Sequence, residues 1–498
     1  MNGRITRVAV AAVVMLGALI VATTYWQTWA AAGLADRQDN EIQRVAQFTI
    51  RRGTIYANDG TTVLARNRVV KAGGKTLYYR VYPQRGLTAH VVGYSTVRRS
   101  QAGLERSFND YLTGANGNLS SVFRSTFDRW RGVTVTGNDV YTTLNARAQQ
   151  VALDALKGQC GAAVALNPRT GAVLVMASSP TYNPNLVERN FTKIGLTKAR
   201  CSGAAPLLNR ATQGLFTPGS TFKIVTAAAA LDSGAFTPDS SFEDPGYCTE
   251  YGTPVYNAGN RDQNGPEAFG RLTLRQGFQH SVNSVFCNVG KKIGAGTILR
   301  YAKRFGFYSV PPFDTPLNER APSGLYSHST LYDPRRPDTA VDPGRLAFGQ
   351  ERMLSTPLQM AMVAATVGTG GIVMRPYVVQ RIVAPNGSVV YRTKPDKLGR
   401  AIKPATAAAL NEMMQLAVTG GTGTAAQIPG IKVAGKTGTA ETGVAGRNTT
   451  WFVGFAPADK PRVAFAVVLE NQTGYGGTTA APIAKLILQA LLPSASKP

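Results

Sequence analysis

Residues 216–225 of this 498-residue chain have the sequence FTPGSTFKIV. Pro218 and Gly219 predict a turn, and the apolar, Ala-rich run that follows predicts a helix with Ser220 in its first turn. Lys223 comes three residues later, so its side chain and that of Ser220 would project from the same helix face. A serine hydroxyl becomes a strong nucleophile when a base accepts its proton, and a lysine can be that base once burial lowers its pKa.

Two later segments carry side chains suited to the same chemistry. Residues 281–283, Ser-Val-Asn, supply a second hydroxyl and an amide, and residues 436–439, Lys-Thr-Gly-Thr, supply a cation, hydroxyls and a glycine. Alone, Ser-x-x-Lys is most often a surface pair, and Ser-x-Asn most often caps a helix. The order and wide spacing of the three motifs instead predict one active site. Its expected catalytic residues are Ser220, Lys223, Ser281, Asn283 and Lys436, and its expected substrate-binding residues are Thr437, Gly438 and Thr439.

Acyl transfer through a covalent serine intermediate is the reaction that these groups support. Ser220 Oγ would attack a carbonyl carbon while Lys223 accepts the hydroxyl proton. The backbone N–H groups of Ser220 and Thr439 would stabilise the oxyanion that develops. Ser281 would relay a proton to the leaving amine, and Asn283 would bind a substrate amide or hold Lys223.

The Lys-Thr-Gly-Thr segment would bind the other end of the substrate. Lys436, Thr437 and Thr439 offer one cation and two hydroxyls, which favour an acyl donor that ends in a free carboxylate. Gly438 would let the ligand approach the backbone closely. Together with Lys223, Lys436 would keep the local potential positive.

Length and charge narrow the class of protein. A chain of 498 residues predicts two or more domains, each with its own core. The net charge of +26 is compatible with binding to nucleic acid, with an anionic membrane or polymer surface, or with simple solubility. The basic residues are scattered, without a long run or an Arg/aromatic alternation, so we expect an anionic envelope as the partner and no nucleic acid.

The N-terminus predicts a membrane anchor. Two arginines precede an uncharged apolar run over about residues 8–26, which is long enough to cross roughly 30 Å of hydrocarbon at about 1.5 Å per residue. We expect a cytoplasmic tail over residues 1–7, a single-pass anchor over 8–28, and the rest of the chain outside the cytoplasm, without access to ATP. A cleaved signal peptide, cut near residues 30–32, is the alternative, although the apolar run exceeds a usual signal-peptide core.

Two further regions follow the expected anchor. Residues 29–137 alternate short β-like runs with Gly, Asn and Asp, and they predict a small β-rich pedestal without a nucleophile. Residues 138–498 carry all three motifs and predict the catalytic domain. A hairpin over 162–177, strands within 431–469 and a closing helix over 480–492 predict a mixed α/β fold, with helices packed on an antiparallel sheet.

The cysteines and histidines do not predict a metal site. Cys160, Cys201, Cys248 and Cys287 contain no Cys-x-x-Cys pair, which argues against zinc. Outside the cytoplasm they allow two disulfides in three connectivities, with Cys248–Cys287 as the first choice, and four buried thiols are the alternative. The three histidines have no metal-ligand spacing and are expected to be structural. We therefore expect no metal and no cofactor.

One further motif has to be rejected. Residues 430–437, GIKVAGKT, match the P-loop pattern, which requires a strand before the first glycine and a helix that begins at the Lys-Thr pair. Here residues 427–429 contain a proline, and the Gly-rich residues 438–443 do not begin a helix. The expected anchor also argues against a nucleotide-binding site, because it would place this segment outside the cytoplasm, without access to ATP. No Gly-x-Ser-x-Gly is present, which argues against an α/β-hydrolase.

Taken together, these motifs resemble those of the class B penicillin-binding proteins, most closely their short PbpA-type members, over nearly all of the chain after the anchor. The N-terminal signatures of that family are matched by Arg52-Gly53, Asn58-x-Gly60, Leu64-Ala65 and Gly103-Leu104-Glu105. Its catalytic signatures are matched, besides the three motifs, by Thr142-Thr143-Leu144, Asn167-Pro168-x-Thr170-Gly171, Leu208-Asn209-Arg210, Thr356-Pro357-Leu358-Gln359-Met360 and Trp451-Phe452-Val453-Gly454. The chain departs from the family at Val282, where Asp or Cys is frequent, and in its short pedestal.

The resemblance implies a peptidoglycan D,D-transpeptidase that needs no metal or cofactor. A D-Ala-D-Ala stem peptide, carried on a lipid-linked precursor, would acylate Ser220 and release its last D-Ala. The amine of a neighbouring stem peptide would then take the acyl group, and penicillin and other β-lactams would acylate the same serine. The resemblance also implies a membrane glycan polymerase as a partner, because this chain has no room for a separate glycosyltransferase domain.

Other functions remain open at this point. A D,D-carboxypeptidase or a β-lactamase on the same fold would use water as the acyl acceptor, but no recognisable deacylating glutamate motif is present. A non-catalytic β-lactam sensor or scaffold would be expected to carry an intracellular signalling domain, and the seven residues before the expected anchor leave no room for one. The acceptor amine and the physiological stage are not predicted.

Overall fold

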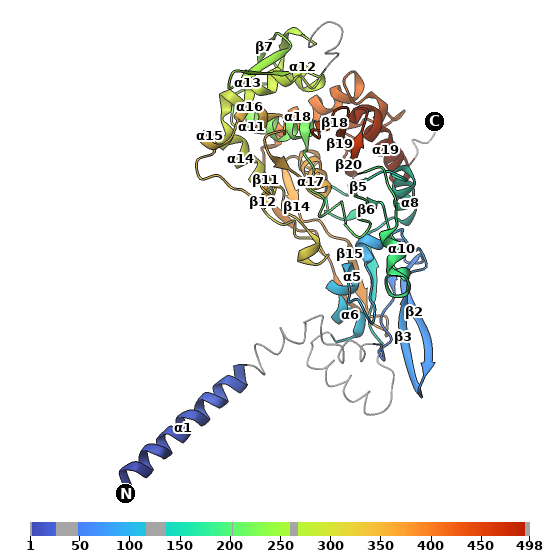
Figure 1. The fold of residues 1–498 in the computed structure, drawn as a ribbon. Coiled ribbons are helices and arrows are strands. Elements are labelled where there is room, and N and C mark those ends of the chain that lie inside the picture. The colour runs from blue at the N-terminus through green and yellow to red at the C-terminus, as the bar shows by residue number, and fades with distance from the viewer. Residues whose placement is uncertain (1, 26–47, 116–135, 202, 259–266, 494–498) are drawn as a thin grey trace.

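The computed structural model describes residues 2–25, 48–115, 136–201, 203–258 and 267–493 (Figure 1). Helix α1 (Asn2–Tyr25) contains a stretch of 20 residues, Thr6–Tyr25, with a mean hydropathy of 2.3, and none of it is buried in the protein. This length and composition suit the predicted membrane anchor. The last three residues of that anchor and the alternative cleavage site lie outside the described residues.

The region predicted to be catalytic is built on a five-stranded antiparallel sheet with the strand order β18-β19-β20-β5-β6. Its strands are β5 (Gly161–Leu166), β6 (Val173–Ser179), β18 (Ala434–Glu441), β19 (Asn448–Ala456) and β20 (Val463–Gln472). The hairpin predicted near the start of this region therefore pairs with the three strands predicted near its end. The mixed α/β prediction is confirmed.

Helices cover both faces of this sheet, because alternate residues of each strand point to opposite sides. Val467 packs in one core with α8 (Ala146–Ala155) and α19 (Gly476–Leu491). Its neighbour Val468 packs in the other core with α11 (Lys223–Asp232) and α17 (Pro357–Gly368). Figure 1 shows α8 and α19 beside the sheet, with α17 on its other side. The sheet is thus a rigid layer between two helical layers.

A second, six-stranded sheet lies at the N-terminal end of the folded region, with the order β16-β15-β4-β1-β2-β3. Its strands are β1 (Ile55–Tyr56), β2 (Val63–Ala72), β3 (Lys75–Val81), β4 (Asp139–Thr142), β15 (Val379–Val383) and β16 (Val389–Arg392). β1 pairs antiparallel with β2 and parallel with β4. The sheet contains strands from both sides of the domain boundary expected at residue 137. That domain boundary stays a prediction.

The remaining elements cover these two sheets or form the lobe at the top of Figure 1 that contains α12 and α13. The helices are α4 (Ala89–Val92), α5 (Gly103–Ser107), α6 (Asn109–Thr113), α9 (Asn185–Arg189), α10 (Phe191–Gly195), η2 (Gly219–Phe222), α12 (Leu274–Gln279), α13 (Asn283–Ile293), α14 (Ala295–Arg304), η3 (Leu317–Glu319), α15 (Pro337–Ala340), α16 (Pro343–Ala347), α18 (Pro404–Thr419) and η4 (Thr424–Ala426). The strands are β7 (Ser241–Asp244), β8 (Tyr247–Glu250), β9 (Thr253–Tyr256), β10 (Gly270–Thr273), β11 (Gly324–Ser327), β12 (Thr330–Leu331), β13 (Met353–Leu354), β14 (Ile372–Met374) and β17 (Lys397–Arg400).

The cysteines form two disulfides, Cys160–Cys201 and Cys248–Cys287, with Cα–Cα distances of 5.8 and 6.4 Å. The first-choice pairing is confirmed, and the alternative of four buried thiols is wrong. The Cys248–Cys287 bridge ties β8 to α13, the helix that begins at Asn283 of the Ser-x-Asn motif. Such a bridge stabilises the fold mainly by restricting the unfolded chain.

Candidate active site

Ser220 lies in a tight helical turn directly before α11. The prediction of one α-helix with Ser220 in its first turn needs correction, because Ser220 belongs to the 3-10 helix η2 and α11 begins at Lys223. Gly219 enters this turn with a φ of +50°, and a Cβ there would lie 2.9 Å from the carbonyl oxygen of Thr439. Glycine therefore allows the turn to lie against β18. Ser220 is half-buried, whereas Lys223 is fully buried.

The side chain of Lys223 joins the first two motifs. Its Nζ donates hydrogen bonds to the backbone oxygen of Ser281 at 2.7 Å and to Oδ1 of Asn283 at 2.8 Å. Ser281 Oγ lies 3.4 Å from the same nitrogen. A neutral amine has two N–H donors and one lone pair, so the two short bonds would leave that lone pair available as a base.

Burial lowers the pKa of Lys223 well below its usual value, and the charge of nearby Lys436 lowers the pKa further. Both effects disfavour the ammonium form, because a charged group loses its hydration on burial and a like charge repels it. The arrangement therefore favours a neutral amine one helical turn after Ser220, as nucleophile activation requires.

Of the Ser-x-Asn motif, Ser281 and Val282 lie in the short connection between α12 and α13, and Asn283 is the first residue of α13. Ser281 has a φ of +62°, in the left-handed region that non-glycine residues seldom adopt. The helix-cap interpretation of this motif is wrong, because the N-cap of α13 is Val282 and makes no side-chain cap bond. Asn283 instead holds Lys223 through its oxygen and donates from Nδ2 to the backbone oxygen of Tyr256 at 3.0 Å.

A buried network supports the start of α13. Asp244 accepts hydrogen bonds from Ser284 Oγ at 2.5 Å and from Nδ2 of Asn257 at 2.9 Å. The Oδ1 atom of Asn257 in turn accepts the backbone N–H of Ser284 at 3.0 Å. Asp244, at the end of β7, and Asn257, directly after β9, belong to no sequence motif and were not predicted. They come into contact with α13 only through the fold.

The Lys-Thr-Gly-Thr motif lies on β18, the outer strand of the five-stranded sheet. Lys436 is fully buried, its Nζ donates to the backbone oxygen of Thr437 at 3.1 Å, and it lies 5.7 Å from the centre of the Phe278 ring. Burial lowers the pKa of Lys436 to about 7. Thr437 Oγ1 lies 2.5 Å from Oγ1 of Thr422, a residue that no sequence motif indicated.

Gly438 and Thr439 bring this strand into contact with the turn that carries Ser220. A Cβ on Gly438 would lie 2.8 Å from the backbone oxygen of Pro218, so a side chain there would push the turn away. Because Thr439 turns its carbonyl toward Gly219, and because the N–H and C=O of one strand residue point to the same edge, the N–H of Thr439 also faces the turn. Its Oγ1 accepts the N–H of Gly476 at 3.2 Å.

The structure does not place a P-loop at residues 430–437, since Lys436 and Thr437 lie within a strand and no helix begins there. A potential metal-binding group among the described residues is formed by Cys248, Glu250 and Cys287. Both sulfur atoms of this group are in the disulfide, so they cannot bind a metal as thiolates.

Two family models match this chain. Residues 161–489 match the penicillin binding protein transpeptidase domain, and residues 52–140 match the penicillin binding protein A dimerisation domain. The first match covers more than half of the chain, which therefore belongs to the penicillin-binding protein transpeptidase family.

The chain aligns with named relatives over almost its whole length. It is 35% identical to the peptidoglycan D,D-transpeptidase PbpA of Mycobacterium tuberculosis H37Rv, over 99% of both chains. It is 34% identical to the PbpA of Mycolicibacterium smegmatis, also over 99% of both chains. The ceftriaxone acyl-enzyme structure of M. tuberculosis penicillin-binding protein A has a TM-score of 0.79 and 32% identity, covering 90% of this chain and 100% of that chain.

The buried lysine of β18 predicts a measurable pH dependence of stability. The folded protein releases the Lys436 proton near its pKa of about 7, whereas the unfolded chain keeps it to about 10.5. Between these values the unfolded state binds more protons, so the destabilising effect of Lys436 decreases as pH rises. We expect Lys436→Met to be more stable than the wild type at pH 7 and this difference to shrink toward pH 10.

Urea unfolding of both proteins across this pH range checks the prediction. Lys460→Met, which changes an exposed lysine in the turn after β19, is the matched control and should show a difference that does not depend on pH. A constant difference for Lys436→Met as well would contradict the prediction.

Proposed function

We propose that this protein is a peptidoglycan D,D-transpeptidase that works through an acyl-Ser220 intermediate. The observation that carries the proposal is the buried amine of Lys223, which lies one helical turn after Ser220 and is held by Ser281 and Asn283. The named relatives are peptidoglycan D,D-transpeptidases, and one solved relative is a penicillin G acyl-enzyme. Penicillin and other β-lactams would acylate the same serine.

In the acylation step, Ser220 Oγ attacks the carbonyl carbon of the penultimate D-Ala and Lys223 takes the hydroxyl proton. The N–H groups of Ser220 and Thr439 stabilise the oxyanion. The loss of one such donor typically lowers the rate by about two to three orders of magnitude. Ser281, within reach of Lys223 Nζ, passes the proton to the departing D-Ala amine. The amine of a second stem peptide then takes the acyl group and releases Ser220.

In this proposal, residues of β18 bind the substrate carboxylate. Lys436 provides the positive charge, and the hydroxyls of Thr437 and Thr439 provide hydrogen bonds. Gly438 keeps the strand close to the turn that carries the nucleophile. No metal or cofactor takes part in any of these steps.

The first test is intact-mass spectrometry after incubation with penicillin G. We expect a stable adduct on the wild type that maps to Ser220 and is absent from Ser220→Ala. Ser233→Ala, an exposed serine after the end of α11, is the matched control and should keep the adduct. Loss of the drug without an adduct would support a hydrolase instead, and neither adduct nor loss would support a non-catalytic sensor or scaffold.

The two lysines predict a bell-shaped pH dependence of the acylation rate. Toward acid pH, Lys223 takes up a proton and can no longer act as a base. Above the pKa of Lys436, about 7, the charge that binds the carboxylate is lost, and we expect a fall of about tenfold. Lys436→Arg keeps a positive charge at every pH, so it should lack the alkaline decline. An identical alkaline decline in that variant would contradict the role given to Lys436.

We further propose that residues 1–7 lie in the cytoplasm, that 8–28 span the membrane, and that 29–137 and 138–498 form the pedestal and catalytic domains outside it. A membrane glycan polymerase is the proposed partner. A membrane-impermeant, lysine-reactive crosslinker applied to intact cells tests both ideas. We expect exposed lysines such as Lys157 to be modified and a polymerase to be captured. Unmodified Lys157 would contradict the topology, and modification without capture would contradict the partner.

A further inference from the structure

The hairpin of β2 and β3 extends beyond the N-terminal sheet as a two-stranded ribbon. β2 pairs with β1 only through Val63 and Ala65, whereas its residues 66–72 pair only with β3. β3 is an edge strand, so no further strand lies beside the ribbon among the described residues. Figure 1 shows the ribbon pointing away from the lobe that contains α12 and α13. None of residues 66–79 is buried, so most of the ribbon is in contact with solvent.

The ribbon is strongly basic. Residues 63–81 contain five basic side chains and no acidic one. One of the five, Arg80, is buried and forms an ion pair with Glu105. The other four are exposed and belong to no ion pair within the described part of the chain: Arg66, Arg68, Lys71 and Lys75. The ribbon therefore presents four positive charges without an acidic partner.

Apolar side chains are also exposed, and they lie on both faces of the ribbon. Val69 is opposite Tyr78 on one face, and Val70 is opposite Leu77 on the other. The side chain of Val69 is 55% exposed, and the other three are partly exposed. Two strands alone have no core in which to bury such groups, so these side chains stay in contact with water unless another surface covers them.

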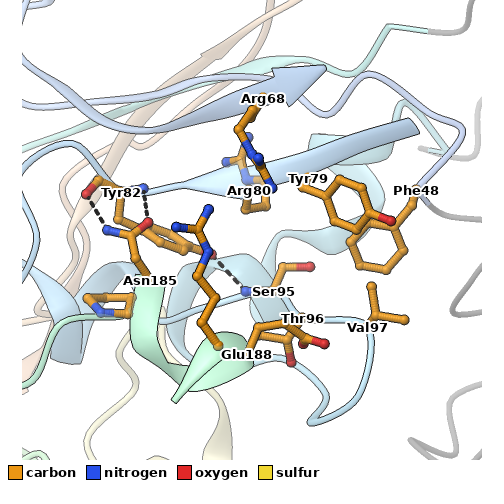
Figure 2. Close-up of a pocket in the computed structure, with 12 residues that line it drawn as sticks. Phe48, Arg68, Tyr79, Arg80, Tyr82, Ser95, Thr96, Val97, Asn185 and Glu188 are labelled. Atoms are coloured by element: carbon orange, nitrogen blue, oxygen red, sulfur yellow. Dashed lines mark hydrogen bonds between the residues drawn. The ribbon is translucent and has the colours of Figure 1, made fainter. Parts of the chain in front are cut away.

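The chain from the predicted anchor joins the folded region at this ribbon. Phe48, the first described residue after positions 26–47, accepts the backbone N–H of Tyr78 at 2.7 Å, and its ring lies 5.5 Å from that of Tyr79. Both rings line a small cavity beside the ribbon (Figure 2). Tyr78 is four residues from Gly74 in the turn, which corresponds to about 14 Å at about 3.4 Å per residue. The basic tip therefore lies close to this junction.

We propose that the β2–β3 ribbon is a second contact with the membrane, in addition to the predicted anchor. Its four exposed cations bind the phosphate groups of anionic phospholipids, and Val69, Val70 and Leu77 lie among the headgroups. A second contact restricts the tilt of the folded region on its tether, and it keeps Ser220 at a defined height above the bilayer. The proposal goes beyond the transpeptidase reaction, and it rests on the proposed location of residues 29–137 beside the membrane.

Basic residues on an edge strand have a second common role, because their charge prevents pairing with a strand of another chain. That role does not involve lipid. A ribbon that only protects its edges would lie equally far from a neutral and an anionic bilayer. The dependence on anionic lipid therefore separates the two roles.

The test measures the position of the ribbon in the full chain, because α1 would attach the protein to any vesicle. All four native cysteines are in disulfides, so Thr76→Cys supplies a single thiol for a fluorophore at an exposed position near the tip. The labelled protein is reconstituted into vesicles of phosphatidylcholine, with or without phosphatidylglycerol, that contain a lipid with a quencher at the headgroup. We expect quenching with phosphatidylglycerol, little quenching without it, and loss of quenching at high salt.

A double variant tests the charges. Lys71→Gln with Lys75→Gln removes two exposed cations at the tip, and each cation near an anionic surface is worth about fivefold in binding. The equilibrium constant for the quenched state should therefore fall at least about tenfold. Lys157→Gln with Lys460→Gln is the matched control, because it removes the same net charge from exposed positions outside the ribbon. This control should keep the quenching of the parent protein.

Three results would overturn the proposal: no quenching, equal quenching in both kinds of vesicle, or an equal loss in the control variant. Shielding of the label from water without quenching by lipid would indicate a protein partner instead, such as a second copy of this chain, and would overturn the proposal as well. The mass of the penicillin adduct, measured on the same samples, reports the proposed function separately. A failure of lipid binding is thus distinguishable from a failure of acylation.

Discussion

The buried amine of Lys223 is the group on which the arrangement of the three motifs depends. It bonds to Ser281 and Asn283, which lie about 60 residues further along the chain, and the charge of Lys436 on β18 disfavours its ammonium form. An ammonium group in this position would be strongly destabilised, whereas a neutral amine with two acceptors is satisfied. The burial and the nearby charge that destabilise the ammonium form are therefore the features that the proposed chemistry requires.

Two features hold the three segments at the required separation. Gly219 and Gly438 remove the side chains that would keep the Ser220 turn away from β18, and the indole N–H of Trp451 bonds to the backbone oxygen of Thr217 at 2.9 Å. Since β18 is an edge strand and pairs with no other strand than β19 among the described residues, its outer edge is available to line the site. Helices on both faces of the sheet keep this edge rigid, and that rigidity preserves the position of the backbone N–H groups.

On the opposite side of the site, α13 is fixed by several independent contacts. The Cys248–Cys287 disulfide ties it to β8, Asn283 bonds to the last residue of β9, and Asp244 accepts a bond from Ser284. These contacts come from one stretch of short strands, β7 to β9, which has no motif of its own. A buried network of this kind is valuable only when every member is satisfied, because each unpaired polar group costs about 1–3 kcal/mol.

Local sequence patterns were enough to predict several elements and the chemical groups: the helix after Ser220, the late strands, the Cys248–Cys287 bridge as first choice, and the three motifs. Turn residues, apolar periodicity and side-chain chemistry act over a few positions, so they can be recognised without the fold. The fold was needed to establish that Asn283 holds Lys223 rather than capping a helix, and that β15 and β16 complete the N-terminal sheet. These outcomes depend on burial and on partners tens to hundreds of residues away, which no local pattern encodes.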